Sequence, residues 1–361
     1  MDTLNGTTEQ RHKFTVKYRQ EYYDLSNFMH KHPGGINTLK GLNQTDMTAR
    51  FLKAPPHSDA AMYLMREYKI SAQDYEGKKK TKERPSAAKL ADNGIELLEQ
   101  TKQSAEDSNN NQLDDSMEFL VDWSEAMLPQ IGKITKHYDE WVHKPVDRPL
   151  RLFGPWYLEI LTKTPWWIVP AFWIPSIIAC GWQEFQENSH NMKGVSFTVL
   201  FSHILFGVLF WTLLEYSLHR WVFHVKLTSD SGPWLCTLHF MIHGLHHKVP
   251  FDPMRLVFPP LPGVILATVI YTPLYFILQN HHPRLILVGA LVGYLGYDMI
   301  HYYLHYGSPS AGQHLYEMKR YHYQHHFAHQ DLGYGISSPL WDIVFNTRIY
   351  LRKLKFQLKW A

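Results

Sequence analysis

Four long stretches without a charged residue place the strongest constraint on how this chain can fold. Pro165–Trp182 is uncharged over 18 residues, Val195–Leu214 over 20 and Leu256–Leu278 over 23, and Leu285–Tyr297 continues past Asp298 to Tyr306. About 20 apolar residues in a helix span the hydrocarbon core of a bilayer. Tryptophans near the ends of these stretches are typical of membrane interfaces. We therefore expect four membrane helices, at about 165–183, 195–215, 256–278 and 285–305; the alternative is a large soluble core of buried helices.

The distribution of lysine and arginine predicts the orientation of these helices. With four crossings, the N-terminus, the 215–255 loop and the C-terminus share one side, which has eleven Lys and Arg residues near the spans. The other side has only Lys193 and Arg284. Positive charge accumulates on the cytosolic side of membrane proteins. Both termini are therefore predicted to be cytosolic.

Histidine is unusually frequent, and 15 of the 23 histidines fall between His219 and His329. Ten of them form four clusters at the predicted cytosolic ends of the spans: His219, His224, His243, His246, His247, His301, His305, His322, His325 and His326. Steps of three and four residues place side chains on one helix face. The five-residue step from His219 to His224 does not, so that pair requires a helix end or a bulge. Ten imidazoles exceed the coordination sphere of one ion, which predicts two metal ions of a type that imidazole binds, such as iron, zinc, copper or nickel.

The remaining histidines of this region are not expected to bind metal. The alternative for any single histidine is a residue at the membrane interface or a hydrogen-bonded residue of the core. His281 and His282 fall on the opposite side of the membrane and should not be ligands, while His203 lies in the middle of a span and should be structural. Asp298, one turn before His301, and His329 are candidates to orient a ligand imidazole by a hydrogen bond.

The N-terminal third of the chain differs in character from the rest. Residues 1–75 mix apolar, aromatic and polar groups, which predicts a small soluble α+β domain, and the chain begins without an apolar signal segment. Residues 76–118 are charged, rich in Asn, Ser and Lys and poor in aromatic residues, which predicts a disordered linker with a short helix near Ile95–Leu98. Residues 119–361 form the predicted all-α membrane domain.

A His-Pro-Gly-Gly motif marks a candidate cofactor site in the first domain. Pro33 and the glycines after it favour a tight turn that fixes His32. His57 lies 25 residues later, and two such histidines can bind a haem iron from opposite faces; His30 is the competing ligand. The segment YDLSNFMHKHPGG resembles a cytochrome b5 haem-binding domain. The resemblance implies a haem b whose axial ligands are His32 and His57.

The four histidine clusters, in their order, resemble the fatty acid hydroxylase and sterol desaturase superfamily of membrane di-metal oxygenases. The segment LHFMIHGLHHKVPFDPMRLVFPP is similar to the fatty acid 2-hydroxylase branch, and the resemblance covers about residues 120–361. It implies an endoplasmic reticulum enzyme whose ten clustered histidines hold two metal ions at a cytosol-facing site. Iron is expected for the chemistry, and zinc can occupy such sites.

These two resemblances together imply a function. A haem with both axial positions filled transfers single electrons and does not bind O2. It can supply the two electrons that O2-dependent hydroxylation requires, drawn from an NAD(P)H reductase of the cytochrome b5 reductase type. The expected reaction is hydroxylation at C2 of long-chain fatty acids, which feeds 2-hydroxy sphingolipid synthesis. Lys248 and Arg255 are candidates to hold the substrate carboxylate, and the alternative for Arg255 is an anchor at the membrane interface.

Two other classes of function remain open from the sequence. One is a sterol or sphingoid hydroxylase or desaturase on the same scaffold, and the other is a non-catalytic electron carrier or metal-handling membrane protein. The formal net charge of +3 is too small to indicate a nucleic acid as partner.

Overall fold

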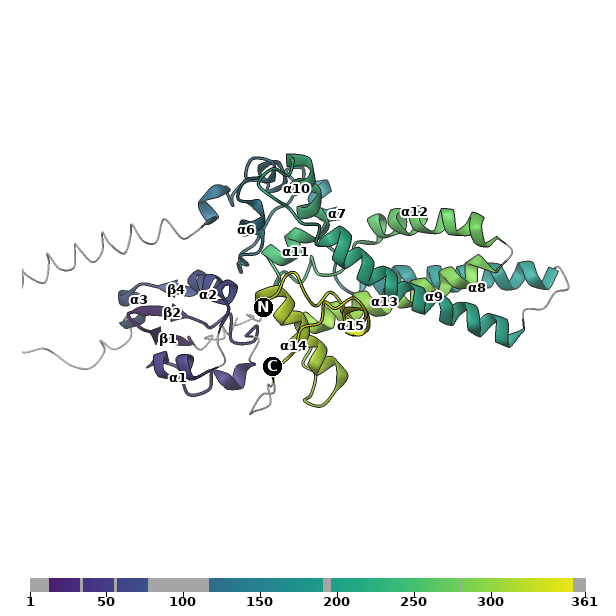
Figure 1. Cartoon of the computed structure of the whole chain (residues 1–361). Helices are drawn as coiled ribbons and strands as arrows, with labels where there is room; N and C mark the ends of the chain where they lie inside the picture. Colours follow the sequence, from purple (N-terminus) through teal and green to yellow (C-terminus); the bar gives the residue numbers. More distant parts are fainter. Residues whose placement is uncertain are drawn as a thin grey trace, which may run out of the picture.

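The computed structural model describes residues 13–32, 35–54, 57–76, 117–190, 196–279 and 281–352. They form a small N-terminal unit of strands and short helices and a long helical unit (Figure 1). The expected linker at 76–118, with its short helix at Ile95–Leu98, lies almost entirely outside the described residues. At its two ends, Glu76 closes helix α3, and Met117 and Glu118 belong to a short 3-10 helix, η3 (Met117–Leu120).

The N-terminal unit is built on a four-stranded sheet, which confirms the α+β prediction. Its strands are ordered β3-β1-β2-β4, with β1–β2 and β2–β4 antiparallel and β1–β3 parallel. The strands are β1 (Thr15–Tyr18), β2 (Glu21–Asp24), β3 (Thr45–Asp46) and β4 (Lys69–Ile70), and the helices are α1 (Thr48–Lys53), α2 (Asp59–Met65) and α3 (Ala72–Glu76), with 3-10 turns η1 (Ile36–Thr38) and η2 (Arg66–Tyr68). Side chains alternate across a strand, so Val16 and Tyr18 face one core, together with Tyr23 and Met47.

Four long helices occupy the positions of the four uncharged stretches. They are α8 (Ile168–His190), α9 (Phe197–Ser217), α12 (Pro260–Leu278) and α13 (Pro283–Tyr306). The closest approach is between α9 and α13, where two glycines face each other. A Cβ added to Gly207 would lie 2.1 Å from the carbonyl oxygen of Ile286, and one added to Gly289 would lie 2.0 Å from that of Ile204. Small residues allow helix backbones to meet in this way within a membrane.

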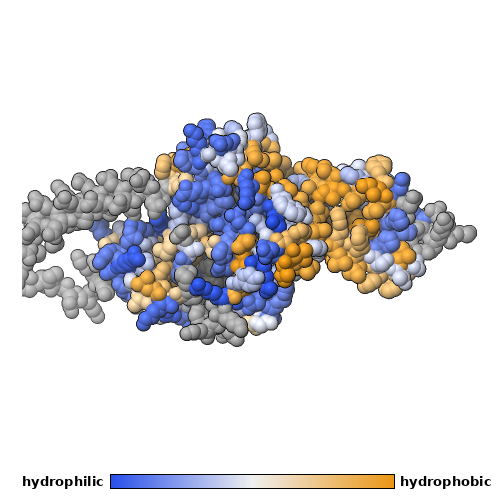
Figure 2. Space-filling view, in the orientation of Figure 1, coloured by the Kyte–Doolittle hydropathy of each residue, from blue (hydrophilic) through white to orange (hydrophobic). Residues whose placement is uncertain are grey.

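Among the described residues, three helices are long and apolar enough to cross a membrane. They are α9 together with the turn that follows it (Phe197–Phe223), α12 and α13. The fourth, α8, has 23 residues, but its last turns contain Glu184 and Glu187 and are more polar. Figure 2 shows an apolar surface over the long helices and a hydrophilic surface over the neighbouring part of the molecule. The membrane prediction is thus supported for three helices, and a crossing by α8 is treated below as a proposal.

Short helices form the part of the helical unit that joins the N-terminal unit. They are α5 (Leu128–Ile131), α6 (Tyr138–Val142), α7 (Trp156–Leu161), α10 (Pro233–His239), α11 (Leu245–Lys248), α14 (His314–Phe327) and α15 (Leu340–Val344). Two π-helical segments are inserted among them, η4 (Leu218–Phe223) after α9 and η5 (Phe240–Gly244) between α10 and α11. Tyr138, Trp141 and Phe240 pack in the core of this part and fix α6 against η5.

Candidate metal centre

The ten clustered histidines converge from four segments and separate into two groups of five. Within each group, one nitrogen from each imidazole lies within 4.8 Å of all the others. The first group is His219, His224, His243, His247 and His325, and the second group is His246, His301, His305, His322 and His326. Two pairs of sequence neighbours, His246 with His247 and His325 with His326, are divided between the groups. The two groups are therefore adjacent and share the helices that position them.

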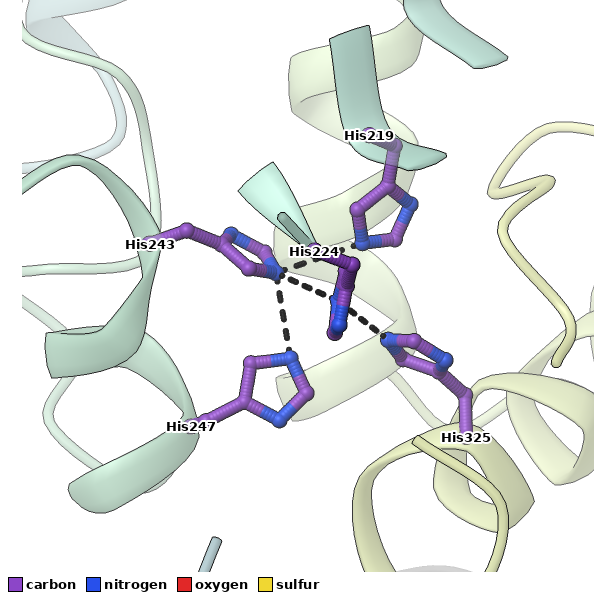
Figure 3. Close-up of side chains that lie close together, drawn as sticks. All are labelled: His219, His224, His243, His247 and His325. Carbon is purple, nitrogen blue, oxygen red and sulfur yellow. Dashed lines mark hydrogen bonds between the residues drawn. The ribbon is translucent and has the colours of Figure 1, made fainter. Parts of the chain in front are cut away.

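The first group points its Nε2 atoms at one small space (Figure 3). The Nε2 atom of His243 lies 3.2 Å from that of His219, 3.1 Å from that of His224 and 3.0 Å from that of His247. The Nε2 atoms of His224 and His325 are 3.1 Å apart. Metal–imidazole bonds of about 2.0–2.1 Å place neighbouring nitrogens about 3 Å apart. The spacing in the first group is therefore that of ligands around one ion.

The second group repeats this geometry with residues from α11, α13 and α14. The Nε2 atom of His322 lies 3.1 Å from that of His301, 2.9 Å from that of His305 and 3.0 Å from that of His326. The Nε2 atoms of His246 and His301 are 3.1 Å apart. Steps of four residues in α13 and α14 place these ligands on one face of each helix. The two groups thus offer similar donor sets for two ions.

The five-residue step between His219 and His224 is accommodated by the π segment η4. Here the N–H of His224 donates to the carbonyl of His219 at 3.0 Å. A π-helix closes hydrogen bonds from residue i to i+5, so residues five apart come onto one face. The bulge that the sequence required for this pair is present.

Burial keeps the imidazoles in the form that binds metal. Desolvation is the largest cause that lowers the pKa of His243, His246 and His247, and it acts in the same way on His322, His325 and His326 of α14. Neighbouring imidazoles lower each of these pKa values further. An imidazole whose pKa lies below neutrality is uncharged at physiological pH and has a free nitrogen lone pair for an ion.

Backbone carbonyls orient the first group, and the loop that supplies them was not identified from the sequence. The Nδ1 atom of His219 lies 2.6 Å from the carbonyl oxygen of Tyr334, and that of His325 lies 2.8 Å from the carbonyl oxygen of Leu332. Asp342 fixes this loop, because its carboxylate accepts the N–H groups of Tyr334 at 3.0 Å and of Gly335 at 2.8 Å. Such outer partners set the tautomer and direction of a ligand imidazole.

The two residues expected to orient ligands from the sequence are placed differently. The carboxylate of Asp298 is buried and accepts the N–H of Phe258, with both oxygens at 3.2 Å. Its role is thus to join the start of α12 to α13, while His301 interacts with the backbone carbonyl of Leu256. His329 is exposed beyond the end of α14. Neither side chain makes a hydrogen bond to a clustered imidazole among the described residues.

Lys248 and Arg255 are structural, which corrects the expectation that they hold the substrate carboxylate. The ammonium of Lys248 donates to Glu118 at 2.7 Å and to the carbonyls of Lys144 at 2.7 Å and Trp141 at 3.0 Å, which uses all three of its hydrogens. Arg255 pairs with Glu159 and donates to Thr162 at 3.0 Å. Both side chains are buried with these partners, so neither is available to a substrate.

The histidines expected to lie outside the site do so. His281 and His282 lie at the turn between α12 and α13, at the end of the long helices that is far from the two groups. The Nδ1 atom of His282 lies 2.8 Å from Glu184, and that of His203 lies 2.8 Å from the carbonyl oxygen of Val199. Neither joins a metal-ligand group.

His32 and His57 face each other in the N-terminal unit, whereas His30 is exposed. Their ring centres are 6.3 Å apart. Bonds of about 2 Å from one iron to each imidazole, with about 1 Å from nitrogen to ring centre, give about 6 Å. Thr38 lies 3.2 Å from the Nδ1 atom of His32, and Phe51 stacks on His57 with ring centres 4.0 Å apart. The pair therefore fits a haem with two axial histidines.

An apolar cavity lies among the long helices. Trp173, Trp211, Gly263 and Leu287 contribute to its wall, and at one end it reaches Phe258 and Tyr294. Tyr294 is two turns before His301 on α13, so the cavity approaches the second group from the apolar side of the molecule. Its apolar and aromatic lining suits the hydrocarbon part of a lipid.

Two family models match the chain. One, described as fatty acid hydroxylase, matches residues 204–347, which include all ten clustered histidines. The other, described as a cytochrome b5-like haem/steroid binding domain, matches residues 6–73.

Characterised relatives extend these matches over nearly the whole chain. The human fatty acid 2-hydroxylase is 39% identical over 344 residues, which cover 92% of this chain and 90% of the relative. A ceramide very long chain fatty acid hydroxylase of Saccharomyces cerevisiae is 31% identical over 99% of this chain and 98% of its own. A dihydroceramide fatty acyl 2-hydroxylase of Arabidopsis thaliana is 41% identical over 63% of this chain and 93% of the relative.

One solved structure is similar to this chain in its three-dimensional fold as well. It is described as full-length scs7p with only the hydroxylase domain visible. It matches with a TM-score of 0.57 and 31% identity over 66% of this chain and 89% of the other.

Proposed function

This chain is an enzyme of the fatty acid hydroxylase family that also has a cytochrome b5-like domain, and we propose that it hydroxylates C2 of long acyl chains destined for sphingolipids. The observation that carries the proposal is the pair of five-histidine groups beside an apolar cavity. Relatives that match most of the chain are named for 2-hydroxylation of fatty acids and of dihydroceramide acyl chains.

Each histidine group holds one metal ion in this proposal. The first group provides five imidazoles that converge from η4, η5, α11 and α14, and the second provides five from α11, α13 and α14. Iron is the expected metal, and zinc can occupy the same nitrogens. When bound, two redox-active ions would supply activation of O2, with one oxygen atom inserted into a C–H bond and the other released as water.

The chain's own residues place the substrate. The cavity between the long helices accepts the hydrocarbon tail, because aromatic and aliphatic side chains line it. Its end near Phe258 and Tyr294 directs the polar end of the lipid toward the histidine groups. A carbon close to the head group, such as C2, then lies nearer to the metal ligands than carbons deep in the tail.

The membrane arrangement follows from the same geometry. We propose that α8 crosses the bilayer with α9, α12 and α13, against which it packs through Trp173 and Val169. The histidine groups and both termini then face the cytosol, where lysine and arginine are concentrated. In the endoplasmic reticulum membrane, this side meets a soluble pool of NAD(P)H and its reductases.

His32 and His57 are proposed as the two axial ligands of a haem b that supplies electrons. Their facing rings support this assignment. A haem bound by two histidines passes one electron at a time, so two transfers complete each hydroxylation.

Lipid analysis of cells that express the protein tests the reaction. We expect 2-hydroxy acyl chains in ceramides and related sphingolipids, and none above background with His301→Ala. Hydroxylated or desaturated sterols or sphingoid bases, without 2-hydroxy acyl chains, would contradict the proposal.

A further inference from the structure

The N-terminal unit is seated on the helical unit through specific ion pairs. The ammonium of Lys31 lies 2.8 Å and 2.5 Å from the two carboxylate oxygens of Asp147. The hydroxyl of Tyr68 donates to the same carboxylate at 2.6 Å. Arg148, the next residue, pairs with Glu67 through two of its nitrogens, the Nε atom at 2.8 Å. Charge pairs of this kind fix the register of two surfaces.

Apolar side chains fill the centre of this contact. Ala60 and Leu64 of α2 pack with Phe251, which follows α11, and with Tyr323 and Phe327 of α14. Phe28 and Tyr68 of the N-terminal unit pack against the same cluster. Figure 1 shows the two units side by side at this place. The contact therefore has an apolar core with ion pairs beside it.

A continuous row of aromatic rings crosses this core. The ring centre of Phe28 is 5.8 Å from that of His32, the proposed haem ligand. From Phe28 to Phe251 the distance is 6.1 Å, and from Phe251 to Phe327 it is again 6.1 Å. Phe327 is 6.2 Å from His326, a member of the second metal-ligand group. Each ring contacts the next, as aromatic pairs at these distances do.

A branch of the row reaches the same group by a second ligand. Phe327 stacks on Tyr323 with ring centres 5.8 Å apart, and Tyr323 is 6.3 Å from His305. Both ends of the branched row therefore fall on the second group. Among the described residues, the rings that pack on the first group, such as Phe223 and Tyr334, make no aromatic contact with the N-terminal unit.

We propose that Phe28, Phe251 and Phe327 form the electron route from the haem to the metal ion of the second group, and that the contact between the two units is the docked state for this transfer. The inference rests on the proposed function. Each transfer oxidises ferrous haem to ferric haem and reduces the metal centre by one electron. Two transfers and two protons accompany one O2, which yields one hydroxyl group and one water. The electrons come from NAD(P)H through a flavin-type reductase.

Packed rings favour this role because electron transfer weakens steeply with the width of any gap it must cross. The row leaves no gap between a haem ligand and a metal ligand. Packing alone does not require aromatic rings at Phe251 and Phe327, because aliphatic side chains of similar volume would fill the same core. A role in electron transfer does require them. Phe28, Phe251 and Phe327 therefore act on electron transfer between the two centres and do not contact the substrate.

Stopped-flow absorbance of the full-length protein in lipid nanodiscs tests the route. The haem is first reduced without oxygen by NADH and cytochrome b5 reductase, and the protein is then mixed with O2 and substrate lipid. We expect Phe251→Leu and Phe327→Leu to slow reoxidation of the haem about tenfold or more, the scale of effects seen for partners of metal ligands. The haem spectrum, the rate of its reduction and the metal content should not change.

Matched variants separate the route from simple packing. Phe251→Tyr keeps the ring and should reoxidise close to the unchanged rate, and Phe153→Leu removes a ring that packs against a different core and should also do so. Metal-depleted protein gives the background rate of direct haem oxidation by O2. Equal reoxidation rates in the Leu variants and the unchanged protein would overturn the proposal, as would a Tyr variant that is as slow as Phe251→Leu.

A charge exchange tests the docked state without altering the rings. Glu67→Arg places two guanidinium groups against each other and should slow reoxidation, and adding Arg148→Glu should restore it. If restoration fails while both variants retain haem and metal, this contact is not the docked state. If the Leu variants slow reoxidation but the unchanged protein makes no 2-hydroxy product, the proposed reaction fails and the route stands.

Discussion

His243 illustrates how each ligand position is specified at the level of single residues. Its Nε2 atom lies within 3.2 Å of three other imidazole nitrogens, and its ring stacks on Phe223 with centres 5.1 Å apart. The nitrogen lone pairs of neutral imidazoles this close together repel one another, and a bound cation removes this repulsion. The same argument applies to His322 in the second group.

Removal of one ligand should therefore be far more damaging than removal of a histidine at the other end of the helices. We expect His243→Ala to lose metal and to reduce 2-hydroxy product at least about tenfold, the lower limit seen even for outer partners of a metal site. His282→Ala removes an imidazole that contacts Glu184 and should retain both metal and activity. The measurement is metal per inserted chain by mass spectrometry together with product. Equal loss in both variants would contradict the assignment of the groups.

Lys248 provides a second residue-level prediction. Its ammonium is buried with Glu118, so Lys248→Met leaves a carboxylate without its charge partner, which costs about 3–5 kcal/mol. We expect a lower melting temperature of the purified protein, with the apparent KM for lipid unchanged in the folded fraction. Pairing Lys248→Met with Glu118→Gln should recover most of the stability, because the unpaired charge is gone. A raised KM at full stability would instead indicate substrate binding.

These residues also show what the sequence can and cannot indicate. Most of the ten histidines were predictable because steps of three and four residues place them on helix faces, and their number requires more than one ion. The five-residue step from His219 to His224 was the exception, since it required a helix end or a bulge. Lys248 and Arg255 were interpreted wrongly because their partners lie 130 and 96 residues away in the chain. Asp342 was missed because its ligands are backbone N–H groups, which no residue pattern reveals.

At the level of elements, the 332–335 loop distinguishes the two metal-ligand groups. It supplies carbonyls to His219 and His325 of the first group. In the second group, the Nδ1 atoms of His246, His322 and His326 have no hydrogen-bond partner among the described residues. The first group is therefore held in place more firmly by its surroundings.

Asp342→Asn tests the importance of this loop. The amide has one acceptor oxygen in place of two, so it can no longer accept both Tyr334 and Gly335 N–H groups in the same way. We expect metal affinity of the first group to fall about tenfold or more and that of the second group to change little. A two-site metal titration measures both affinities. Asp331→Asn, at the exposed residue that precedes this loop, is the control, and equal effects of the two substitutions would contradict the role of Asp342.

The elements themselves were predictable to different degrees. The small α+β unit follows from the mixture of apolar, aromatic and polar residues in the first 75 residues, and α9, α12 and α13 follow from length and apolar composition. The uncharged stretch ends at Trp182 and did not predict the polar end of α8, because the helix continues through Glu184 and Glu187. The π segment η4 was indicated only indirectly, by the five-residue step from His219 to His224, and η5 was not predicted.

At the scale of the whole molecule, the account depends on both histidine groups and both termini lying on one side of the bilayer. We expect reporter tags near residues 190 and 281 to face the lumen, and tags at the N-terminus, at residue 230 and at the C-terminus to face the cytosol. Glycosylation of inserted acceptor sites in microsomes measures this. A tag at residue 190 on the same side of the membrane as the N-terminus would mean that α8 does not cross the membrane.

The contact between the two units also belongs to the scale of the whole molecule. The amino-acid composition of the chain does not predict it. Lys31, Glu67 and Tyr68 meet Asp147 and Arg148 across about 80 to 116 residues of chain. The sequence predicted a linker between the two units, and the described structure adds the surface through which the N-terminal unit contacts the helical unit.

The most direct test of the account is the source of the oxygen atom in the product. Membranes that contain the protein are incubated with acyl lipid, NADH, a cytochrome b5 reductase and isotopically heavy O2, and acyl chains are analysed by mass spectrometry. The account predicts one heavy oxygen atom in the hydroxyl group at C2, and no such product with His301→Ala. A hydroxyl oxygen derived from water, or a hydroxyl group at another carbon, would contradict the proposal that this chain is an O2-dependent acyl 2-hydroxylase.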